Sequence, residues 1–338
     1  MKISVLIVTI FLLMGCERAP EQMYITGSTM GTTYNIKYIS PEGNSALSEE
    51  KIKIDVDKVL DEVNNQMSTY RNDSELSSFN QFRSTEPFTV SPALVTVMQE
   101  AIRLNTVTEG ALDVTVGPLV NLWGFGPNAR PEKVPTDEQL ELAKERVGIQ
   151  YLKVDSRSLS VSKTVPDLYV DLSTIAKGWG VDLVAALLEN RGIQNYLIEI
   201  GGEIRTKGVS STGSMWRIAI EKPDTEQRAV QELIQPGDLG MATSGDYRNY
   251  FEQDGVRYSH IIDPSTGRPI DNKVASVTVL HASAMTADGL ATGLMVLGEK
   301  RAMQVAERLK IPVLMIVKSE NGFEEVSSTT FQPFLVSK

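Results

Sequence analysis

The order of strand-like and helix-like segments is the sequence feature that most constrains the fold. Tyr34, Ile36 and Tyr38 alternate with polar residues, which is the pattern of a half-buried strand. Most other strand-like runs follow one another in the second half of the chain, at Tyr196–Ile200, Trp216–Ile220, Tyr247–Phe251, Val256–His260, Val274–Leu280 and Ile311–Val317. Helical patterns are scattered among these runs instead of following each strand. This order predicts an α+β fold rather than a doubly wound sheet.

Capping residues predict where the helices begin and end. Ser, Thr and Asp accept hydrogen bonds from the free N–H groups of a first helical turn, and glycine suits the residue after a last turn. These signals predict helices after Ser48, after Ser91-Pro92, from Thr136 to Gly148, at Val181–Arg191 and at Arg301–Leu309.

The first sixteen residues resemble a lipoprotein signal. Ile3–Met14 is an apolar run of twelve residues, and a membrane-spanning helix needs about 20. Leu13-Met14-Gly15-Cys16 follows the pattern at which a lipoprotein signal peptidase cuts before a lipid-modified cysteine. We therefore expect a signal peptide at 1–15, a lipidated tether at 16–22 and one domain at 23–338. The alternative is an ordinary secreted protein in which Cys16 is incidental.

Acylation of Cys16 would place the protein on the periplasmic side of a bacterial membrane. Cys16 is the only cysteine in the chain, so its acylation would exclude disulfides, thiol nucleophiles and cysteine-bound zinc. In Gram-negative lipoproteins an aspartate after the cysteine retains the protein in the inner membrane. Glu17 occupies that position here, which favours the outer membrane over the inner one.

Several function classes are excluded by charge and by missing motifs. The formal net charge is −10 and the pI is about 5, whereas nucleic-acid binding requires a basic surface. The chain has no phosphate-binding loop of the P-loop type and no dinucleotide-binding glycine fingerprint. His260 and His281 are its only two histidines, so a multi-histidine metal site is excluded.

Two polar clusters are candidates for binding phosphate and a divalent cation. Asp171–Gly180, which includes Lys177, joins a strand to a helix, and a helix N-terminus attracts anions. In the second cluster, Asp288 and Thr292 are four residues apart and share a face if helical, which suits Mg²⁺. The alternatives are a capped turn at the first cluster and an Asp that serves only the helix dipole at the second.

A third cluster contains a candidate general base. His260 stands at the end of a strand, before the turn Asp263-Pro264-Ser265-Thr266-Gly267, and a histidine that titrates near neutral pH suits this role. The alternative is a hydrogen-bonded structural histidine. The same structural interpretation is favoured for His281, which lies in the next strand.

Taken together, the motifs resemble the ApbE family of FAD:protein FMN transferases over roughly residues 24–318. Eight motifs occur in the family order, at 30–34, 67–71, 110–118, 171–180, 199–203, 242–247, 260–264 and 287–292. The resemblance implies a T-fold-like α+β body, with mixed, mostly antiparallel sheets, packed helices and a deep FAD cleft. It also implies that FAD is split and that FMN passes to a Thr or Ser hydroxyl of a partner protein as a phosphoester, releasing AMP.

The resemblance also assigns residues. It implies FAD contacts at Met30, Tyr70, Ala111, Leu112, Asp113, Asp171, Lys177 and Ile262. It implies Mg²⁺ ligands at Asp288, Thr292 and Thr174, the last through a backbone carbonyl, and His260 as the group that activates the acceptor hydroxyl. Some members have an acidic residue at the position of Ala291 and many have glycine at that of Thr174, so part of the metal shell differs here.

The resemblance implies acceptors and leaves two other functions open. The acceptors it implies are extracytoplasmic flavoprotein subunits of sodium-pumping NADH:quinone oxidoreductase and of Rnf-type complexes. One alternative is a pyrophosphatase that hydrolyses FAD to FMN and AMP with water as acceptor. The other is a lipoprotein that binds flavin without turnover.

Overall fold

The computed structural model describes residues 21–40, 47–126, 134–223, 230–246, 250–320 and 322–336. The predicted signal peptide and Cys16 lie outside these residues, so the structure does not test either prediction. No helix among the described residues is both long enough and apolar enough to cross a membrane.

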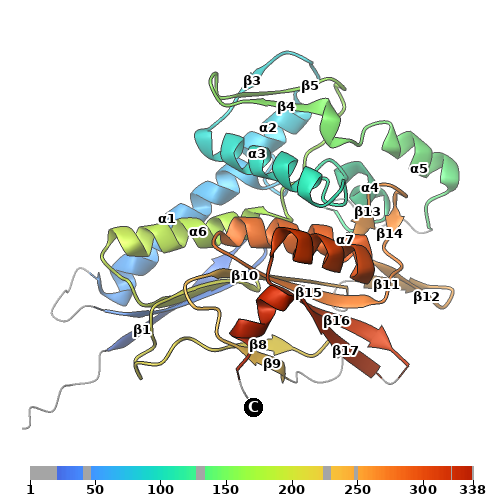
Figure 1. The fold of residues 1–338 in the computed structure, drawn as a ribbon. Helices are drawn as coiled ribbons and strands as arrows, with labels where there is room; N and C mark the ends of the chain where they lie inside the picture. The colour runs from blue at the N-terminus through green and yellow to red at the C-terminus, as the bar shows by residue number, and fades with distance from the viewer. Residues whose placement is uncertain are drawn as a thin grey trace, which may run out of the picture.

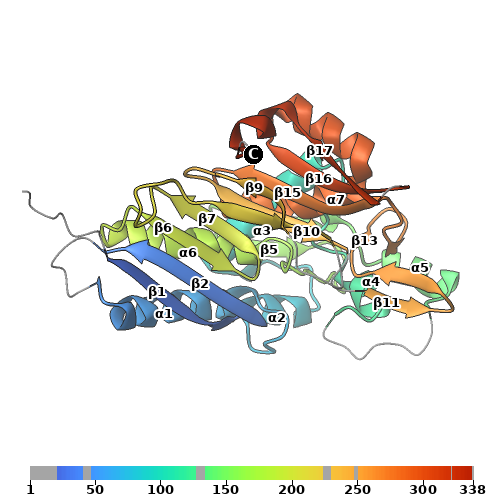
Figure 2. The ribbon, with the colours of Figure 1, turned by 90° about the horizontal axis from the view of Figure 1, so that it is seen from below.

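An eight-stranded sheet forms the base of the molecule, and every pairing in it is antiparallel. Figure 2 shows its strands in the order β1-β2-β6-β7-β10-β15-β16-β17. Their bounds are β1 Gln22–Thr29, β2 Thr32–Ile39, β6 Tyr196–Ile200, β7 Glu203–Lys207, β10 Gly240–Gly245, β15 Val274–His281, β16 Val313–Ser319 and β17 Gly322–Ser327.

Three long helices cover one face of this sheet (Figure 1). They are α1 Glu49–Met67, α6 Ala176–Asn190 and α7 Ala284–Leu309. The apolar stripe of α1 packs with α6 and strands β1, β2 and β6 in one buried cluster that includes Ile52, Tyr34 and Val184. The large cluster around α7 joins it to β15, β16 and α3. Burial of these faces is the main force that fixes the helices on the sheet.

A second layer lies beyond these helices, on the side away from the sheet (Figure 1). It contains the helices α2 Glu75–Gln81 and α3 Pro92–Val107. It also contains a three-stranded sheet, in the order β3 Phe88–Thr89, β5 Ser160–Lys163 and β4 Leu152–Asp155. The 3₁₀ turn η2 Ile149–Tyr151 directly precedes β4. At one end stand α4 Gly117–Leu122, α5 Asp137–Lys144 and the hairpins β11 Tyr250–Gln253 with β12 Val256–Ser259 and β13 Ile262–Asp263 with β14 Arg268–Pro269.

The opposite face of the main sheet has a smaller cover. It consists of the pair β8 Ile218–Glu221 and β9 Val230–Ile234 and the 3₁₀ helix η3 Thr329–Phe334. Ile234 and Phe331 are buried there against Met241 and Leu280 of the sheet. The main sheet is therefore buried on both faces at its centre.

The α+β prediction is confirmed, and most predicted caps stand where expected. Ser48 and Ser91 are N-cap residues, and Thr136 forms a reciprocal capping box with Gln139. The helix that begins at Asp137 is shorter than predicted and ends at Lys144, four residues before Gly148. Helix α7 spans Ala284–Leu309, but the non-helical backbone of Gly298 (φ 73°, ψ 168°) divides it into two segments, and the second segment contains the helix predicted at Arg301–Leu309.

A buried lysine fixes the segment that leads to Asp171. Lys163 is 1% exposed, and its ammonium donates to the carbonyl oxygens of Phe79, Asn80 and Leu168 at 3.1–3.3 Å. The Asn80 side chain pairs with both backbone groups of Val170 at 2.8 and 2.9 Å. These bonds tie α2 to the residues immediately before the Asp171 cluster.

The same lysine predicts a pH dependence of stability. Burial lowers the pKa of Lys163 from 10.5 to about 8. Between pH 8 and 10.5 the unfolded chain therefore binds more protons at this site than the folded protein, and the free energy of unfolding rises with pH. We expect the difference in unfolding free energy, wild type minus Lys163→Met, to increase by about 1–2 kcal/mol between pH 8 and 10. Urea unfolding at several pH values measures it, and a difference that stays constant would contradict the prediction.

Candidate active site

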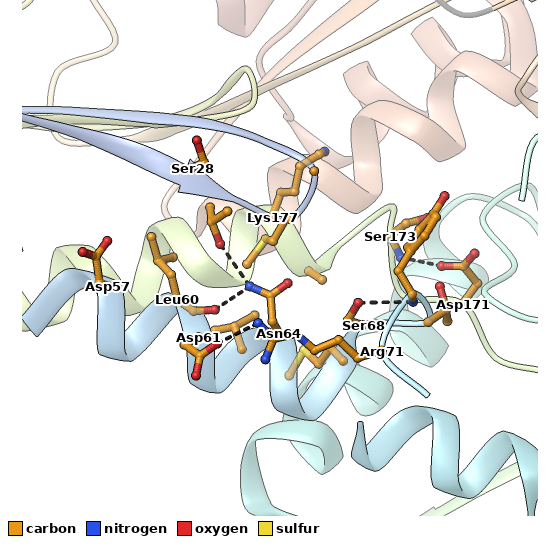
Figure 3. Close-up of a pocket in the computed structure, with 18 of the residues that line it drawn as sticks. Ser28, Asp57, Leu60, Asp61, Asn64, Ser68, Arg71, Asp171, Ser173 and Lys177 are labelled. Carbon is orange, nitrogen blue, oxygen red and sulfur yellow. Dashed lines mark hydrogen bonds and ion pairs between the residues drawn. The ribbon is translucent and has the colours of Figure 1, made fainter. Parts of the chain in front are cut away.

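A cleft of about 1050 Å³ opens between the β1–β2 turn, helix α1 and the start of α6. Figure 3 shows Asp57, Asp61 and Asn64 of α1 along one side, with Arg71 donating to Asp61 at 2.7 Å, and Asp171 beside Ser173 at one end. The cleft walls are mostly polar side chains, which include Ser28, Thr29, Lys53, Ser68, Thr69, Ser173 and Lys177.

A smaller pocket of about 160 Å³ adjoins this cleft. Tyr70, Asp171 and Ser173 line both cavities, so the two form one continuous site. Tyr70 is 71% exposed and stands at the junction. The smaller pocket receives residues from six separate parts of the chain, within 70, 111–126, 171–174, 244, 260–264 and 292–296.

The structure brings the sequence-predicted residues together. Of the predicted FAD contacts, the larger cleft is lined by Met30, Tyr70, Asp171 and Lys177, and the smaller pocket by Tyr70, Ala111, Leu112, Asp113, Asp171 and Ile262. Thr174, Thr292 and His260 also line the smaller pocket. Asp288 lines neither cavity and lies buried beside the first turn of α6.

Met30 enters the cleft from a two-residue hairpin turn. Thr29 pairs with Thr32, so Met30 and Gly31 form the whole turn between β1 and β2. Both residues have positive φ angles, 50° and 70°, as the favoured hairpin turn requires. Glycine adopts this conformation freely, whereas a methionine in it is uncommon. The turn aims the Met30 side chain at Gly180 of α6.

Asp288 of α7 caps the N-terminus of α6. Ile175 is the N-cap residue of α6 and has no side-chain group for this purpose. The N–H of Gly178 instead donates to Asp288 Oδ2 at 2.9 Å, across 110 positions in the sequence. The α6 helix therefore begins at Ala176, five residues before the predicted start, with its first turn in the site.

Asp182 of α6 caps α7 in return. Its carboxylate accepts from the N–H groups of Ala284 and Met285 at 3.0 Å and from the Ser283 hydroxyl at 2.7 Å. Arg205 donates to the same carboxylate at 2.6 Å. Each helix thus supplies the carboxylate that caps the N-terminus of the other. These contacts fix the position of Asp288 relative to Lys177.

The close approach of α6 and α7 depends on Gly178. A Cβ at this position would lie 2.3 Å from the Ala284 carbonyl oxygen, which is backbone and unable to rotate away. We expect Gly178→Ala to lower the free energy of unfolding by about 1–3 kcal/mol or more, since the helices must separate. Gly180→Ala is the matched control, because its nearest neighbours would be the flexible side-chain ends of Met30, Leu60 and Ile200, at 3.1, 3.4 and 3.8 Å. Equal destabilisation of the two variants in urea unfolding would contradict this account.

A buried charge cluster surrounds Lys177. Its ammonium lies 2.8 Å from Glu203 Oε1 and 3.9 Å from Asp288 Oδ1, and both acidic residues are 4% exposed. Burial raises the pKa of Asp288 to about 8, against the opposing effect of the Lys177 charge. Burial also raises the pKa of Glu203. For Lys177, burial lowers the pKa, but the two carboxylates outweigh it and the net direction is upward. The cluster carries two acids for one base.

The residues present fit a divalent cation with few protein ligands. Asp288 and Thr292 lie one turn apart on α7, and the Thr174 hydroxyl oxygen is buried without a hydrogen-bond partner. Thr174 and Thr292 line the same pocket. Within the described residues no three His, Cys, Asp or Glu side chains cluster into a metal site. One carboxylate with two hydroxyl-bearing residues suits Mg²⁺, which keeps waters and takes substrate phosphates as further ligands.

Asp113 and Asp171 hold loops in shape at the pocket wall. The Asp113 carboxylate accepts from the Thr115 hydroxyl and N–H and from the Ile149 N–H, at 2.6–3.1 Å. Asp171 accepts from the Ser173 N–H at 2.9 Å. Burial raises the pKa of both carboxyls. The oxygens of both carboxylates therefore already accept hydrogen bonds from backbone N–H groups of this part of the chain.

The two histidines differ in environment. His260 follows β12 directly and lines the smaller pocket, with its ring edge-on to Phe125 at 6.2 Å. His281 lies at the end of β15, where its Nδ1 accepts from the Ser283 N–H at 3.0 Å. Burial lowers the pKa of His281. This geometry places His260 at the site and gives His281 the structural role favoured from the sequence.

Glu203 and Ser244 are among the site residues that were not assigned from the sequence. Glu203 belongs to the motif at 199–203, and the signal that could have singled it out is an acidic residue after two glycines. Ser244 lines the smaller pocket. The hydroxyl of its neighbour in β10, Thr243, is instead hydrogen-bonded at 2.9 Å to the hydroxyl of Thr278 on the adjacent strand β15. Because successive side chains of a strand point to opposite faces, the alternation in β10 could have shown that Ser244 and Thr243 lie on different faces of the sheet.

Comparison with known proteins identifies the family. The model of the ApbE family matches residues 30–315. The chain belongs to the ApbE family. A protein named FAD:protein FMN transferase from Vibrio cholerae is 63% identical, over 98% of each chain, and one of the same name from Haemophilus influenzae is 51% identical, over 96% of this chain and 95% of the other. The solved flavin transferase ApbE from Vibrio cholerae superposes with a TM-score of 0.87 over 94% of this chain and all of that one. The family prediction is confirmed.

Proposed function

We propose that this chain transfers FMN from FAD to a Thr or Ser hydroxyl of a partner flavoprotein, in a Mg²⁺-dependent reaction that releases AMP. The observation that carries the proposal is that His260, Thr174 and Thr292 converge in one pocket that opens into a cleft of about 1050 Å³. The transferase activity is supported by the names of relatives that are 63% and 51% identical over nearly the whole chain.

The cleft and the pocket together would hold FAD in an extended form. Met30 and Tyr70 offer apolar and aromatic surface, and Lys177, in the first turn of α6, lines the larger cleft with an ammonium that also pairs with Glu203. A helix N-terminus adds a favourable field for phosphate. The loop fixed by Asp113 lines the smaller pocket, and the loop fixed by Asp171 lines both cavities. Pre-formed positioning of this kind lowers the entropic barrier of a phosphoryl transfer.

His260 is the residue in position to take a proton from the acceptor. A threonine hydroxyl is a weak nucleophile until its proton leaves, and a positioned base typically contributes about 10²–10⁴-fold to the rate. His260 lines the same pocket as the hydroxyl-bearing residues Thr174 and Thr292. The acceptor hydroxyl would therefore enter through the smaller pocket.

Asp288, Thr292 and Thr174 are the residues that would hold Mg²⁺. Mg²⁺ held there would supply charge neutralisation for the pyrophosphate and the leaving AMP. Gly178 holds one Asp288 oxygen in place through its N–H, so the carboxylate keeps one orientation. The position of Ala291 supplies no acidic ligand, which leaves waters or carbonyl oxygens to complete the shell.

Release of AMP separates the transferase from the alternatives. The full-length protein in detergent is incubated with FAD and Mg²⁺, with and without a protein domain that carries a threonine acceptor motif. AMP that forms only with the acceptor supports the transferase. AMP and free FMN that form without an acceptor would support the pyrophosphatase, and intact FAD in both samples would support a flavin-binding protein.

The acceptor and the location form part of the same proposal. We propose extracytoplasmic flavoprotein subunits of sodium-pumping NADH:quinone oxidoreductase or Rnf-type complexes as acceptors, on the periplasmic side of a bacterial membrane. Cys16 is the proposed lipid anchor, which rests on the signal-like sequence before it. Incorporation of labelled palmitate into the wild type but not into Cys16→Ser tests the anchor, and equal labelling would overturn it.

A further inference from the structure

We propose that Glu203 is a positioning residue that holds the Lys177 ammonium away from Asp288 and so keeps the Asp288 carboxylate free for a divalent cation. The inference rests on the proposed Mg²⁺ dependence and extends it to residues of the β6–β7 turn. It follows from a conflict of charges in the first turn of α6. A lysine that paired fully with Asp288 would occupy the same oxygens that a cation needs.

The distances show which carboxylate Lys177 prefers. Its Nζ forms a direct bond to Glu203 Oε1 at 2.8 Å, while Asp288 Oδ1 is 3.9 Å away, beyond hydrogen-bond range. The other Asp288 oxygen is held by the Gly178 N–H. Asp288 Oδ1 is therefore the oxygen that the ammonium and a cation would compete for.

Glu203 has the capacity to hold the ammonium on its own. It is 4% exposed, and its second oxygen, Oε2, is buried without a hydrogen-bond partner. A buried carboxylate oxygen without a partner is costly in free energy. Glu203 Oε2 therefore offers the Lys177 ammonium a second acceptor on the same residue when a cation approaches Asp288.

The turn that carries Glu203 is built to touch the lysine. Ile200 pairs with Glu203, so Gly201 and Gly202 form the whole turn, with φ angles of 60° and 106°. A Cβ on Gly201 would lie 3.3 Å from the Lys177 Cδ, so the turn backbone lies against the lysine stem. Glu199 fixes the turn by accepting from the Gly202 N–H at 2.8 Å. The β6–β7 turn and Glu203, the residue after it, thus contact both the aliphatic stem and the ammonium of Lys177.

The charge balance favours this division of roles. Two buried carboxylates face one ammonium, so the cluster retains one negative charge if both acids are ionised. Removal of the Glu203 charge would leave Asp288 as the remaining carboxylate beside Lys177. The ammonium would then move to Asp288, because an unpaired buried charge is strongly disfavoured. Cation binding would have to displace it.

The test measures binding of Mn²⁺, as a probe for Mg²⁺, to the full-length protein in detergent by electron paramagnetic resonance, without FAD turnover. We expect Glu203→Gln to raise the dissociation constant of Mn²⁺ at least about tenfold. The double variant Lys177→Met, Glu203→Gln should return to within about threefold of wild type. Glu189→Gln is the charge-matched control and should behave as wild type, because Glu189 lies at the far end of α6, paired with Lys207 and Tyr196.

Two results would overturn the inference: wild-type Mn²⁺ affinity in Glu203→Gln, or no recovery in the double variant. If Glu203→Gln fails to fold, as judged by circular dichroism, Lys177→Met alone decides. It should bind Mn²⁺ at least as tightly as wild type, and weaker binding would contradict the role of Lys177 as a competitor. A wild-type protein that binds no Mn²⁺ would overturn the proposed metal dependence itself and the inference with it.

Discussion

Replacement of His260 with alanine is expected to slow FMN transfer by about 10²–10⁴-fold, the usual contribution of a positioned base. FAD binding should persist, because His260 is one wall residue among many in the smaller pocket. The single-turnover rate of FMN transfer measures the first effect, and flavin retention on equilibrium dialysis measures the second. Added imidazole should restore part of the rate in His260→Ala if the missing group is a base.

His281→Ala is the matched control for this experiment. His281 is the other histidine of the chain, and its ring nitrogen accepts from the Ser283 N–H outside both cavities. We expect its transfer rate to stay within about threefold of wild type, with a lower melting temperature from the lost bond. Wild-type transfer by His260→Ala with bound FAD would remove His260 from the mechanism.

Replacement of Asp288 is expected to separate its two roles. Asp288→Asn keeps an oxygen that can accept from the Gly178 N–H but loses the charge that would hold Mg²⁺. We expect it to fold with nearly wild-type stability and to lose at least about 100-fold in Mg²⁺-dependent transfer. Asp288→Ala also leaves the buried Gly178 N–H unpaired, which costs about 1–3 kcal/mol of stability.

The measurements are the transfer rate as a function of Mg²⁺ concentration and the free energy of unfolding in urea. A rise in activity of Asp288→Asn at high Mg²⁺ would show that metal affinity, rather than folding, is impaired. Full activity of Asp288→Asn at the wild-type Mg²⁺ requirement would show that Asp288 does not anchor the metal. Equal stability of the Asn and Ala variants would contradict its role as the cap of α6.

Local signals in the sequence were enough to predict many of the elements. Thr136 and Ser91 cap their helices through side-chain bonds to residues only three positions away. The alternating strands at 33–38 and 196–200 appear as β2 and β6 because one face of each is buried. Such signals depend on neighbours in the sequence, and they remain valid in the folded chain.

Features that depend on contacts between residues far apart in the sequence could not be predicted from local patterns. The start of α6 was placed five residues late because its capping carboxylate, Asp288, comes from 110 positions further along. The pairing of β7 with β10 omits β8 and β9, an order that periodicity does not encode. The role of Glu203 depends on Lys177, 26 positions earlier, so no local pattern links them.

The candidate site was predicted largely through family motifs, and the structure explains why the motifs stand where they do. Residues such as Met30, Asp171 and Ile262 come from separate elements, yet they line two cavities that share one wall. Their spacing in the sequence has no period, because Met30 lies in the β1–β2 turn, Asp171 in the segment before α6 and Ile262 in β13.

The most direct test of the central claim is the intact mass of an acceptor protein. The full-length chain in detergent is mixed with FAD, Mg²⁺ and a domain that carries a threonine acceptor motif, and the acceptor is then weighed by mass spectrometry. Our account predicts a gain of one FMN that disappears when Mg²⁺ is chelated or when the acceptor threonine is replaced by alanine. An unmodified acceptor alongside free FMN and AMP would contradict the transferase and favour hydrolysis of FAD.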